Sequence, residues 1–212
     1  MTKVLILGAG GQVAGHVIDR LLQNNSIHLT LYLRNASHLQ HLEGERIKLI
    51  EGDILDDEKL ENAMQRQDLV YVNINGQEDV IAEQTVKAML TAGVKRIVFI
   101  AAIGIYDEVP GAFGLWNKQM IGPILERYQK AASLIEASGL VYTILRPTWY
   151  TNNDEVDYKI TQKGQPVTGT EISRKSVADL VVKLIEDPTL HVNESLGMEK
   201  AGTEADKPGF MN

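Results

Sequence analysis

Short apolar runs alternate with helical patterns from residue 4 to residue 145, and this alternation is the strongest constraint on the fold. The runs, rich in β-branched and aliphatic residues, lie at 4–7, 28–33, 46–50, 69–74, 96–101 and 141–145. Such runs are typical of strands buried on both faces. Helical patterns lie between them at 11–23, 57–65, 79–91 and 123–137. Because parallel neighbouring strands need a crossover, the alternation predicts an α/β fold, a doubly wound parallel sheet with helices on both faces.

A further helix is expected near the end of the chain. Ser173 or Ser176 is predicted to cap it, and its apolar positions recur at helical spacing until Pro188 ends it. The basic residues Arg174 and Lys175 could indicate phosphate binding, but a capped helix start explains this stretch without a ligand.

The regular pattern ends at Pro147, and the rest of the chain is expected to form a smaller unit. We predict one domain over residues 1–212, in which residues 148–212 form a small C-terminal substrate lobe and tail over the edge of the sheet. The tail from Lys200 has few apolar residues, so we expect it to be loose or to pack on a neighbouring molecule.

The composition narrows the classes of partner. A net charge of -7 repels polyanions, so we expect neither nucleic acid nor a membrane surface as a partner. The chain has no cysteine, which excludes disulfides and thiolate chemistry, and a cytoplasmic location is expected. No metal site is predicted, because His38 and His41 lie one helical turn apart without a third ligand. The expected partner is a small-molecule acceptor, and the expected state is a monomer or homodimer.

The segment LILGAGGQVAG at residues 5–15 connects the first predicted strand to the first predicted helix. In doubly wound sheets the diphosphate of a dinucleotide binds at this turn, on the helix N-terminus. Gly8 is expected to allow a sharp turn and Gly11 a close backbone approach, while Ala14 and Gly15 let the helix pack near the sheet. The alternative is a tight turn with no ligand. The residues predicted to bind a cofactor here are Gly8, Gly10, Gly11, Gln12 and Val13.

The end of the second strand indicates which dinucleotide binds. Sites for NAD place a carboxylate there to hold the ribose 2′-hydroxyl, whereas this chain has Arg34. A guanidinium can bind a 2′-phosphate, with Ser37 or His38 as helpers, so NADP(H) is favoured over NAD(H). The alternative is that Arg34 is a solvated surface charge.

Two further stretches complete the predicted cofactor site. Asp53, which follows the third strand, is assigned to the adenine amino group, and Ile54 is expected to cover the ring. Asp56 or Asp57 is expected to cap the next helix, and the alternative is that Asp53 also serves that cap. Residues 73–76, beginning with Asn73, are expected to pass beside the ribose.

Motifs over nearly the whole chain point to a known family. They are LILGAGGQVAG, Arg34 after the second strand, GDILD, KRIVFIAAIGIY, SGLVYTILRP and ISRKSVADL. Together they resemble the atypical short-chain dehydrogenase/reductases of the NAD(P)H-binding, NmrA-like family, and among these the bacterial proteins labelled NADH-flavin reductases. The resemblance implies a Rossmann-like domain with a reduced C-terminal lobe, and a nicotinamide near the residues that follow Ala101 and Pro147.

One departure from the wider superfamily concerns its catalytic tyrosine, lysine and serine. None of the seven tyrosines has a lysine four positions later, and alanines at 101 and 102 stand where the serine is expected. The tyrosinate chemistry of alcohol and carbonyl conversion is therefore not expected. Tyr106 and Lys130 are the remaining candidates for proton supply.

These features favour an oxidoreductase that transfers hydride from NADPH to a flavin, a quinone or a similar planar acceptor. Such a reaction depends mainly on positioning, and FMN or FAD would be a substrate rather than a bound prosthetic group. Residues 105–119 are expected to form a loose lid whose aromatic side chains face Trp149 and Tyr150, although core packing explains these aromatics equally. The alternative function is a non-catalytic redox sensor that binds NADP(H).

Overall fold

An eight-stranded sheet forms the centre of the computed structural model, which describes residues 1–211. Its strand order is β3-β2-β1-β4-β5-β6-β10-β8, and only the β10–β8 pair is antiparallel. The strands are β1 (Thr2–Leu7), β2 (Ile27–Leu33), β3 (Ile47–Glu51), β4 (Leu69–Val72), β5 (Arg96–Ile100), β6 (Val141–Pro147), β8 (Lys159–Gln162) and β10 (Glu194–Glu199). The prediction of a doubly wound parallel sheet is confirmed.

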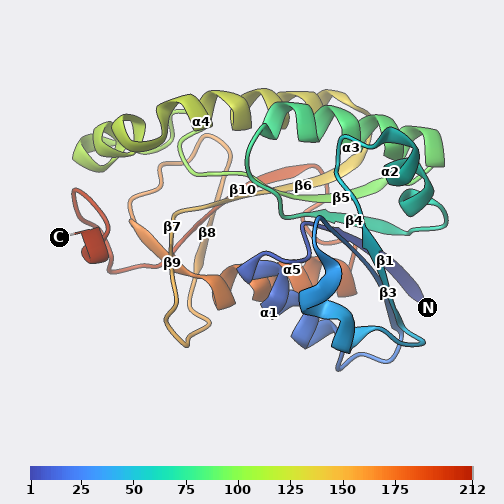
Figure 1. Cartoon of the computed structure of the whole chain (residues 1–212). Helices are drawn as coiled ribbons and strands as arrows, with labels where there is room; N and C mark the ends of the chain where they lie inside the picture. The colour runs from blue at the N-terminus through green and yellow to red at the C-terminus, as the bar shows by residue number, and fades with distance from the viewer. Residues whose placement is uncertain (212) are drawn as a thin grey trace.

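Helices cover both faces of this sheet (Figure 1). On one face lie α2 (Asp57–Met64), α3 (Glu78–Ala92) and α4 (Gly111–Ala137), and on the other α1 (Gln12–Leu21) and α5 (Arg174–Glu186). A short helix, η1 (Ala36–Leu42), follows β2, and another, η2 (Gly209–Met211), lies in the tail. Strand β1 joins both cores, because Val4 and Ile6 pack toward α1 and α5 while Leu5 and Leu7 pack toward the other layer. Burial on both faces explains the continuous apolar runs.

The direction of the winding reverses between β1 and β4. The chain proceeds outward from β1 through β2 to β3 and then returns to place β4 on the other side of β1. Gly8 turns the chain out of β1 at a φ of +81°. A Cβ atom on Gly8 would lie 2.3 Å from the carbonyl oxygen of Asn73, so no other residue fits without displacing backbone. The predicted sharp turn at Gly8 is confirmed.

The packing role predicted for Gly15 is wrong. Ala14 is fully buried against the sheet, as expected for a close helix approach. A Cβ atom on Gly15, in contrast, would meet no atom within 4 Å. Helix α1 therefore does not need a glycine at this position.

Strand β4 is shorter than the sequence predicted. It ends at Val72 rather than at Ile74, and Gly76 and Gln77 have φ values of +88° and +57°. These left-handed conformations turn the chain into α3, so residues 73–77 form a loop at the carboxyl end of the strand.

The prediction of a loose lid is wrong for most of residues 105–119, because α4 begins at Gly111. The backbone leaves helical geometry at Ile121, just before Pro123, which divides α4 at a kink. Asn117 anchors the first half of the helix. Its amide group donates to the Ile103 carbonyl at 3.2 Å and accepts from the Trp149 indole at 2.9 Å. Contacts remote in sequence thus order this segment.

The C-terminal residues extend the main sheet and add a small second one. Strands β10 and β8 continue the sheet beyond β6, while β7 (Trp149–Thr151) and β9 (Glu171–Ser173) form a separate parallel pair. Ser173 caps α5, since its hydroxyl accepts from the Ser176 amide at 3.0 Å. The sequence had left the choice between these two serines open.

The tail is not loose within the part of the chain that the structure describes. The Thr170 hydroxyl donates to the Thr203 carbonyl at 2.6 Å, Gly169 and Glu204 form an isolated β-bridge, and the Gly209 amide donates to Glu171. The tail therefore lies along β9 of its own chain.

Within residues 1–211, no helix combines the length and the apolar character needed to cross a membrane.

Replacing Gly8 with alanine should destabilise the protein, whereas Gly15→Ala should not. At Gly8 the substitution combines a left-handed φ with a contact against backbone, and we expect the free energy of unfolding to fall by at least about 2 kcal/mol. At Gly15 the Cβ meets open space inside a helix, so a gain of about 0.5–1 kcal/mol is expected. Urea denaturation of both variants measures the difference, and equal stabilities would contradict the steric argument.

Candidate functional site

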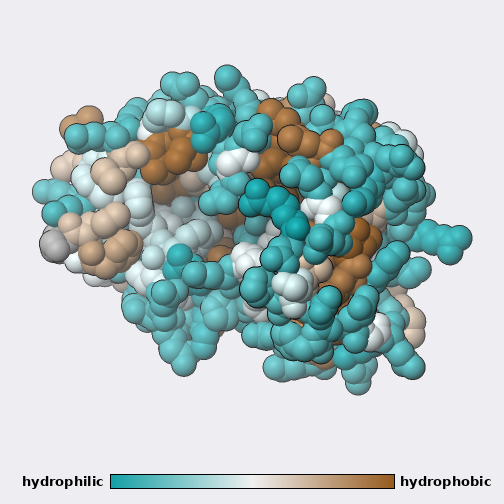
Figure 2. Space-filling view, viewed as in Figure 1, coloured by the Kyte–Doolittle hydropathy of each residue, from teal (hydrophilic) through white to brown (hydrophobic). Residues whose placement is uncertain are grey.

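A continuous cleft follows the carboxyl ends of the parallel strands. It consists of two adjoining cavities of about 530 Å³ and about 460 Å³. Both are lined by Gly11, Asn73, Ile74 and Asn75, which places their junction at the β1–β4 reversal. Ligands of doubly wound sheets bind at this position. In Figure 2 most of the visible face is hydrophilic, with apolar patches along the upper helices and a further one toward the right of the molecule.

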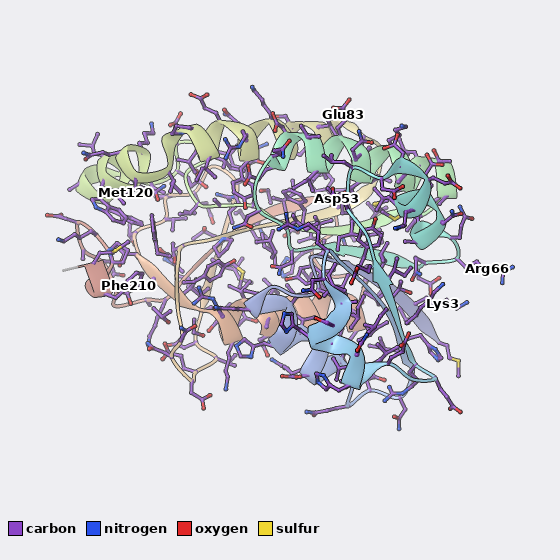
Figure 3. All side chains as sticks on the ribbon, viewed as in Figure 1. Lys3, Asp53, Arg66, Glu83, Met120 and Phe210 are labelled. Carbon is purple, nitrogen blue, oxygen red and sulfur yellow. The ribbon has the colours of Figure 1, made fainter. Side chains whose placement is uncertain are left out.

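All residues predicted to bind a cofactor line this cleft. The cavity near β2 and β3, which we call the adenosine end, is lined by Gly8, Gly10, Arg34, Asp53 and Ile54. Figure 3 shows Asp53 in the middle of the molecule, whereas Lys3 and Arg66 lie at the far edge. The cavity near β5 and β6, the reactive end, is lined by Gln12, Val13, Ala101 and Pro147. Residues distant in sequence thus meet along one surface.

The turn before α1 fits the diphosphate of a dinucleotide. A Cβ on Gly11 would lie 2.3 Å from the Asn73 amide nitrogen, so glycine keeps the floor of the cleft open. Gly11 also occupies the N-cap of α1 and makes no side-chain hydrogen bond. Within residues 1–211, the N–H groups of Gln12 and Val13 have no acceptor. Free amides at a helix N-terminus are donors suited to a phosphate group.

The adenosine end carries a hydrogen-bonded loop after β3. One carboxylate oxygen of Asp53 accepts from the Leu55 amide at 2.9 Å, and the Tyr32 hydroxyl donates to the Asp53 carbonyl at 2.7 Å. Burial, together with the nearby charges of Asp56 and Asp53, raises the pKa of Tyr32 to about 12, so this phenol stays protonated. Asp56 caps α2 through the Lys59 amide, as predicted for Asp56 or Asp57.

Arg34 is exposed at the rim of the adenosine end. Among the described residues, no carboxylate lies within 4.0 Å of its guanidinium. Of its two predicted helpers, His38 lines the cavity, whereas the Ser37 hydroxyl donates to the Asn35 side chain at 2.6 Å. A cation without an internal partner therefore stands beside the end of β2, where the sequence predicted a 2′-phosphate.

Backbone hydrogen bonds fix the floor of the reactive end. The Ala101 amide donates to the Leu145 carbonyl at 2.7 Å, and the Ile103 amide donates to the Pro147 carbonyl at 3.2 Å. The segments that follow β5 and β6 are thereby held side by side. Aromatic side chains of Tyr128, Trp149 and Tyr150 also line this cavity, so a small apolar floor lies among flat side chains.

A buried ion pair braces the same region. The Arg146 guanidinium pairs with Glu108, and the two side chains are 0% and 1% exposed. Arg146 also donates to the Ser195 carbonyl at 3.1 Å, while Glu108 accepts from the Tyr106 amide at 2.9 Å. These bonds tie the segment after β5 to β6 and β10. Removing one partner of such a pair leaves an uncompensated buried charge, so separating these segments is costly.

Neither candidate for proton supply lines the cleft. The Tyr106 hydroxyl donates to Glu136 at 2.7 Å, and the Tyr106 ring lies 4.2 Å from the Lys163 ammonium. Lys130 is exposed on α4. The geometry therefore gives no support to their predicted catalytic role, and a different tyrosine, Tyr128, occupies the cavity wall.

The tyrosines in the reactive end are held in the protonated form. Burial raises the pKa of Tyr128 and of Tyr150 well above the usual 10.0. Both phenols are therefore neutral at physiological pH and can donate hydrogen bonds, but a tyrosinate base is not available there. The reactive end therefore offers no tyrosinate base, in agreement with the sequence, which has no Tyr-x-x-x-Lys pair.

Several lining residues were not predicted. Asn117, Tyr128, Thr148 and Arg174 all line the reactive end. Tyr128 and Asn117 lie on α4, where the sequence pattern indicated only core packing or a lid. Arg174 begins α5, and its role was attributed to helix capping.

Comparison with known proteins gives a consistent result. The chain matches the NAD(P)H-binding family over residues 8–188. It is 41% identical to a Rossmann-fold NAD(P)-binding family protein from Shigella flexneri, with a TM-score of 0.86 and 100% of both chains covered. A short-chain dehydrogenase/reductase from Veillonella parvula, solved in complex with NADP, is 29% identical with a TM-score of 0.92 over 99% of both chains.

A curated relative is quinone oxidoreductase 2 from Escherichia coli, strain K12. The two sequences are 27% identical over 154 residues, which is 71% of this chain and 50% of the relative. The chain spans about half the length of two of the curated relatives that it matches.

We expect Tyr128 to remain protonated until the pH exceeds 10. Burial disfavours the phenolate, so its pKa is raised and the proton is retained above the usual value of 10.0. Tyrosinate absorbance measured against pH for the native protein and for Tyr128→Phe should therefore differ only above pH 10. The urea-unfolded protein, in which tyrosines titrate near the usual value, serves as the control, and a difference below pH 10 would contradict the assignment.

Proposed function

The chain belongs to the NAD(P)H-binding family, and from this premise we propose that it is an NADPH-dependent oxidoreductase acting on a flavin, a quinone or a similar planar acceptor. The observation that carries the proposal is the continuous cleft, which runs from the adenosine end beside Arg34, past the glycine turn, to the aromatic-lined reactive end. A dinucleotide laid along this cleft would place its reactive ring beside Ala101 and Pro147.

The choice of NADPH rests on Arg34. Its guanidinium presents a planar set of donors that matches a phosphate, and no carboxylate within the described residues competes for it. A carboxylate at this position would instead repel a 2′-phosphate. The NADP complex of the Veillonella parvula relative supports the same choice.

The residues of the reactive end hold the two reacting rings in place and supply neither an acid nor a base. When bound, a reduced nicotinamide supplies a hydride from its C4 atom, and the acceptor then takes a proton from water. Ala101 and Pro147 provide a small apolar floor against which one flat ring can lie. Trp149 and Tyr150 provide flat apolar surface for a second ring. Holding two rings in contact lowers the barrier without an acid or a base.

A planar acceptor fits this arrangement better than an alcohol or a ketone. Reduction of an isolated carbonyl requires proton transfer to the alkoxide, for which the superfamily uses its tyrosine and lysine. Here the lysine is absent, and the pKa of Tyr128 is raised. A conjugated acceptor spreads the incoming charge over its own ring system. The relationship to quinone oxidoreductase 2 supports this class of acceptor.

We expect NADPH to be oxidised in the presence of FMN or a naphthoquinone. Loss of the reduced nicotinamide absorbance, followed with and without acceptor, measures the reaction, and NADPH should be used more efficiently than NADH. The background rate without acceptor is the control. Tight NADPH binding with no acceptor-dependent oxidation would contradict the enzymatic proposal and would favour a non-catalytic redox sensor.

Removal of the Arg34 side chain should affect NADPH far more than NADH. A hydrogen bond to a charged group contributes about 1.5–3 kcal/mol, so Arg34→Ala is expected to weaken NADPH binding by roughly tenfold to a hundredfold. The affinity for NADH, which lacks the 2′-phosphate, should change little. Isothermal titration calorimetry with both nucleotides measures the two effects.

Arg66→Ala provides the matched control. Arg66 is exposed like Arg34, but it lies away from the cleft at the edge of the molecule (Figure 3). The control variant should bind both nucleotides like the unmodified protein. An equal loss for NADPH and NADH in Arg34→Ala would refute a contact with the 2′-phosphate.

A further inference from the structure

Arg174 makes contacts that helix capping does not explain. The cap of α5 is complete without it, because the Ser173 hydroxyl accepts from the Ser176 amide at 3.0 Å. The Arg174 guanidinium instead donates to the Asn152 side chain at 2.8 Å and lies 5.1 Å from the centre of the Tyr150 ring. The same terminal nitrogen also donates to the Thr151 carbonyl at 3.4 Å, so the other nitrogens of the guanidinium keep their donors available.

Arg174 lies where two cavities meet. It lines the reactive end of the cleft together with Tyr150, and it also lines a neighbouring cavity of about 600 Å³. Gln12, in the first turn of α1, is the other residue shared by the two cavities. A molecule held against Trp149 and Tyr150 could therefore extend past Arg174 into the second cavity.

Arg174 also lacks an anionic partner. Among the described residues, the guanidinium groups of Arg20, Arg127 and Arg146 pair with carboxylates, whereas that of Arg174 has none within 4.0 Å. Its neighbour Lys175 differs, because the Lys175 ammonium pairs with Asp154 at 2.5 Å.

Neither carboxylate of the second cavity lies within 4.0 Å of the Arg174 guanidinium. The other charged groups there are Asp19 and the Asp154–Lys175 pair, with His16 beside them. The hydroxyl of Thr151, which lines the same cavity, is buried without a partner in the part of the chain that the structure describes. Unused polar groups of this kind are uncommon in folded proteins and are frequently satisfied by a ligand or water. The cavity thus offers the Arg174 guanidinium to an anionic group, whereas the Thr151 hydroxyl is buried.

We propose that Arg174 binds an anionic group, a phosphate or a carboxylate, carried by the acceptor. This inference rests on the proposed function, since it assigns the acceptor to the reactive end. The planar part of the acceptor lies against Trp149 and Tyr150, and its anionic side chain reaches the second cavity. The two arginines that line the cleft then serve its two ligands, Arg34 the nucleotide and Arg174 the acceptor. The acceptor class is thereby narrowed to planar compounds with an acidic side chain.

The test compares acceptors that differ only in the anionic group. FMN and riboflavin share one ring system, and only FMN carries a phosphate. A naphthoquinone with a propionate side chain and the same quinone with a propyl chain form the corresponding carboxylate pair. For at least one pair we expect the anionic acceptor to have the lower KM, and Arg174→Gln to raise that KM by about tenfold or more. The KM of the neutral acceptor should change less than about twofold.

Lys175→Gln is the matched control variant. It removes one positive charge from the adjacent position in the same cavity, but that charge is already paired with Asp154. It should leave the preference for the anionic acceptor in place, and Arg174→Lys should restore part of it, because the charge returns without the planar geometry. The acceptor pair whose KM values change in Arg174→Gln identifies the anion as phosphate or carboxylate.

Two results would overturn the inference. One is an equal change in KM for the anionic and the neutral acceptor of both pairs. The other is a loss of NADPH affinity in Arg174→Gln with no change in acceptor preference, which would assign Arg174 to the nucleotide diphosphate.

Equilibrium binding separates this inference from the proposed function. Flavin fluorescence quenching, measured in the presence of NADP⁺, reports FMN and riboflavin affinity without any turnover. If no acceptor is reduced, the enzymatic proposal fails. Tighter binding of FMN than of riboflavin, abolished in Arg174→Gln, would still support the anion site. Binding of the two quinones is measured by calorimetry. Equal binding of the two flavins together with equal binding of the two quinones would reject the anion site.

Discussion

The close approach of the β1–α1 turn to the end of β4 is the constraint on which the site depends. Gly8 stands against the Asn73 carbonyl and Gly11 against the Asn73 amide, so any side chain at either glycine would occupy the space of Asn73. This contact lies at the point where the winding reverses and the strand ends diverge. It therefore brings the uncapped first turn of α1 into the cleft. The same contact joins the adenosine end to the reactive end, because Asn73 and Gly11 line both.

The parallel core was predictable because each strand carries its own evidence in the sequence. Runs such as 96–100 are apolar at every position except the first, as a strand buried on both faces requires. Strand β10 escaped prediction because it buries Ser195, Gly197 and Glu199. Gly197 is needed where a Cβ would lie 2.3 Å from the Thr161 hydroxyl, and Glu199 accepts from the Thr168 amide at 2.7 Å. Tertiary partners make these polar residues compatible with a central strand, and local sequence does not show those partners.

The candidate site likewise has a part that the sequence predicts and a part that it does not. The glycine turn, Arg34 and Asp53 each follow a recognisable strand, so their place at the carboxyl edge follows from the fold class. The reactive end depends on pairings between distant segments, such as Asn117 with Trp149, which turn an expected loose lid into the first half of a helix. Tyr106 was a remaining candidate for proton supply, yet the Tyr106 hydroxyl donates to Glu136 on α4. A side chain's direction depends on packing that the sequence pattern does not specify.

The proposed binding of small anions by an acidic protein depends on local charge and on rigidity. A net charge of -7 opposes polyanions at long range, but at physiological ionic strength such repulsion is screened within about 8 Å. Inside the cleft, local donors dominate. Among the described residues, the first amides of α1 have no acceptor, and the arginines near each end have no carboxylate partner. The buried Arg146–Glu108 pair ties together the segments that follow β5 and end β6, which carry the floor of the reactive end. The two proposed ligands would therefore depend on these preformed local donors rather than on the net charge of the protein.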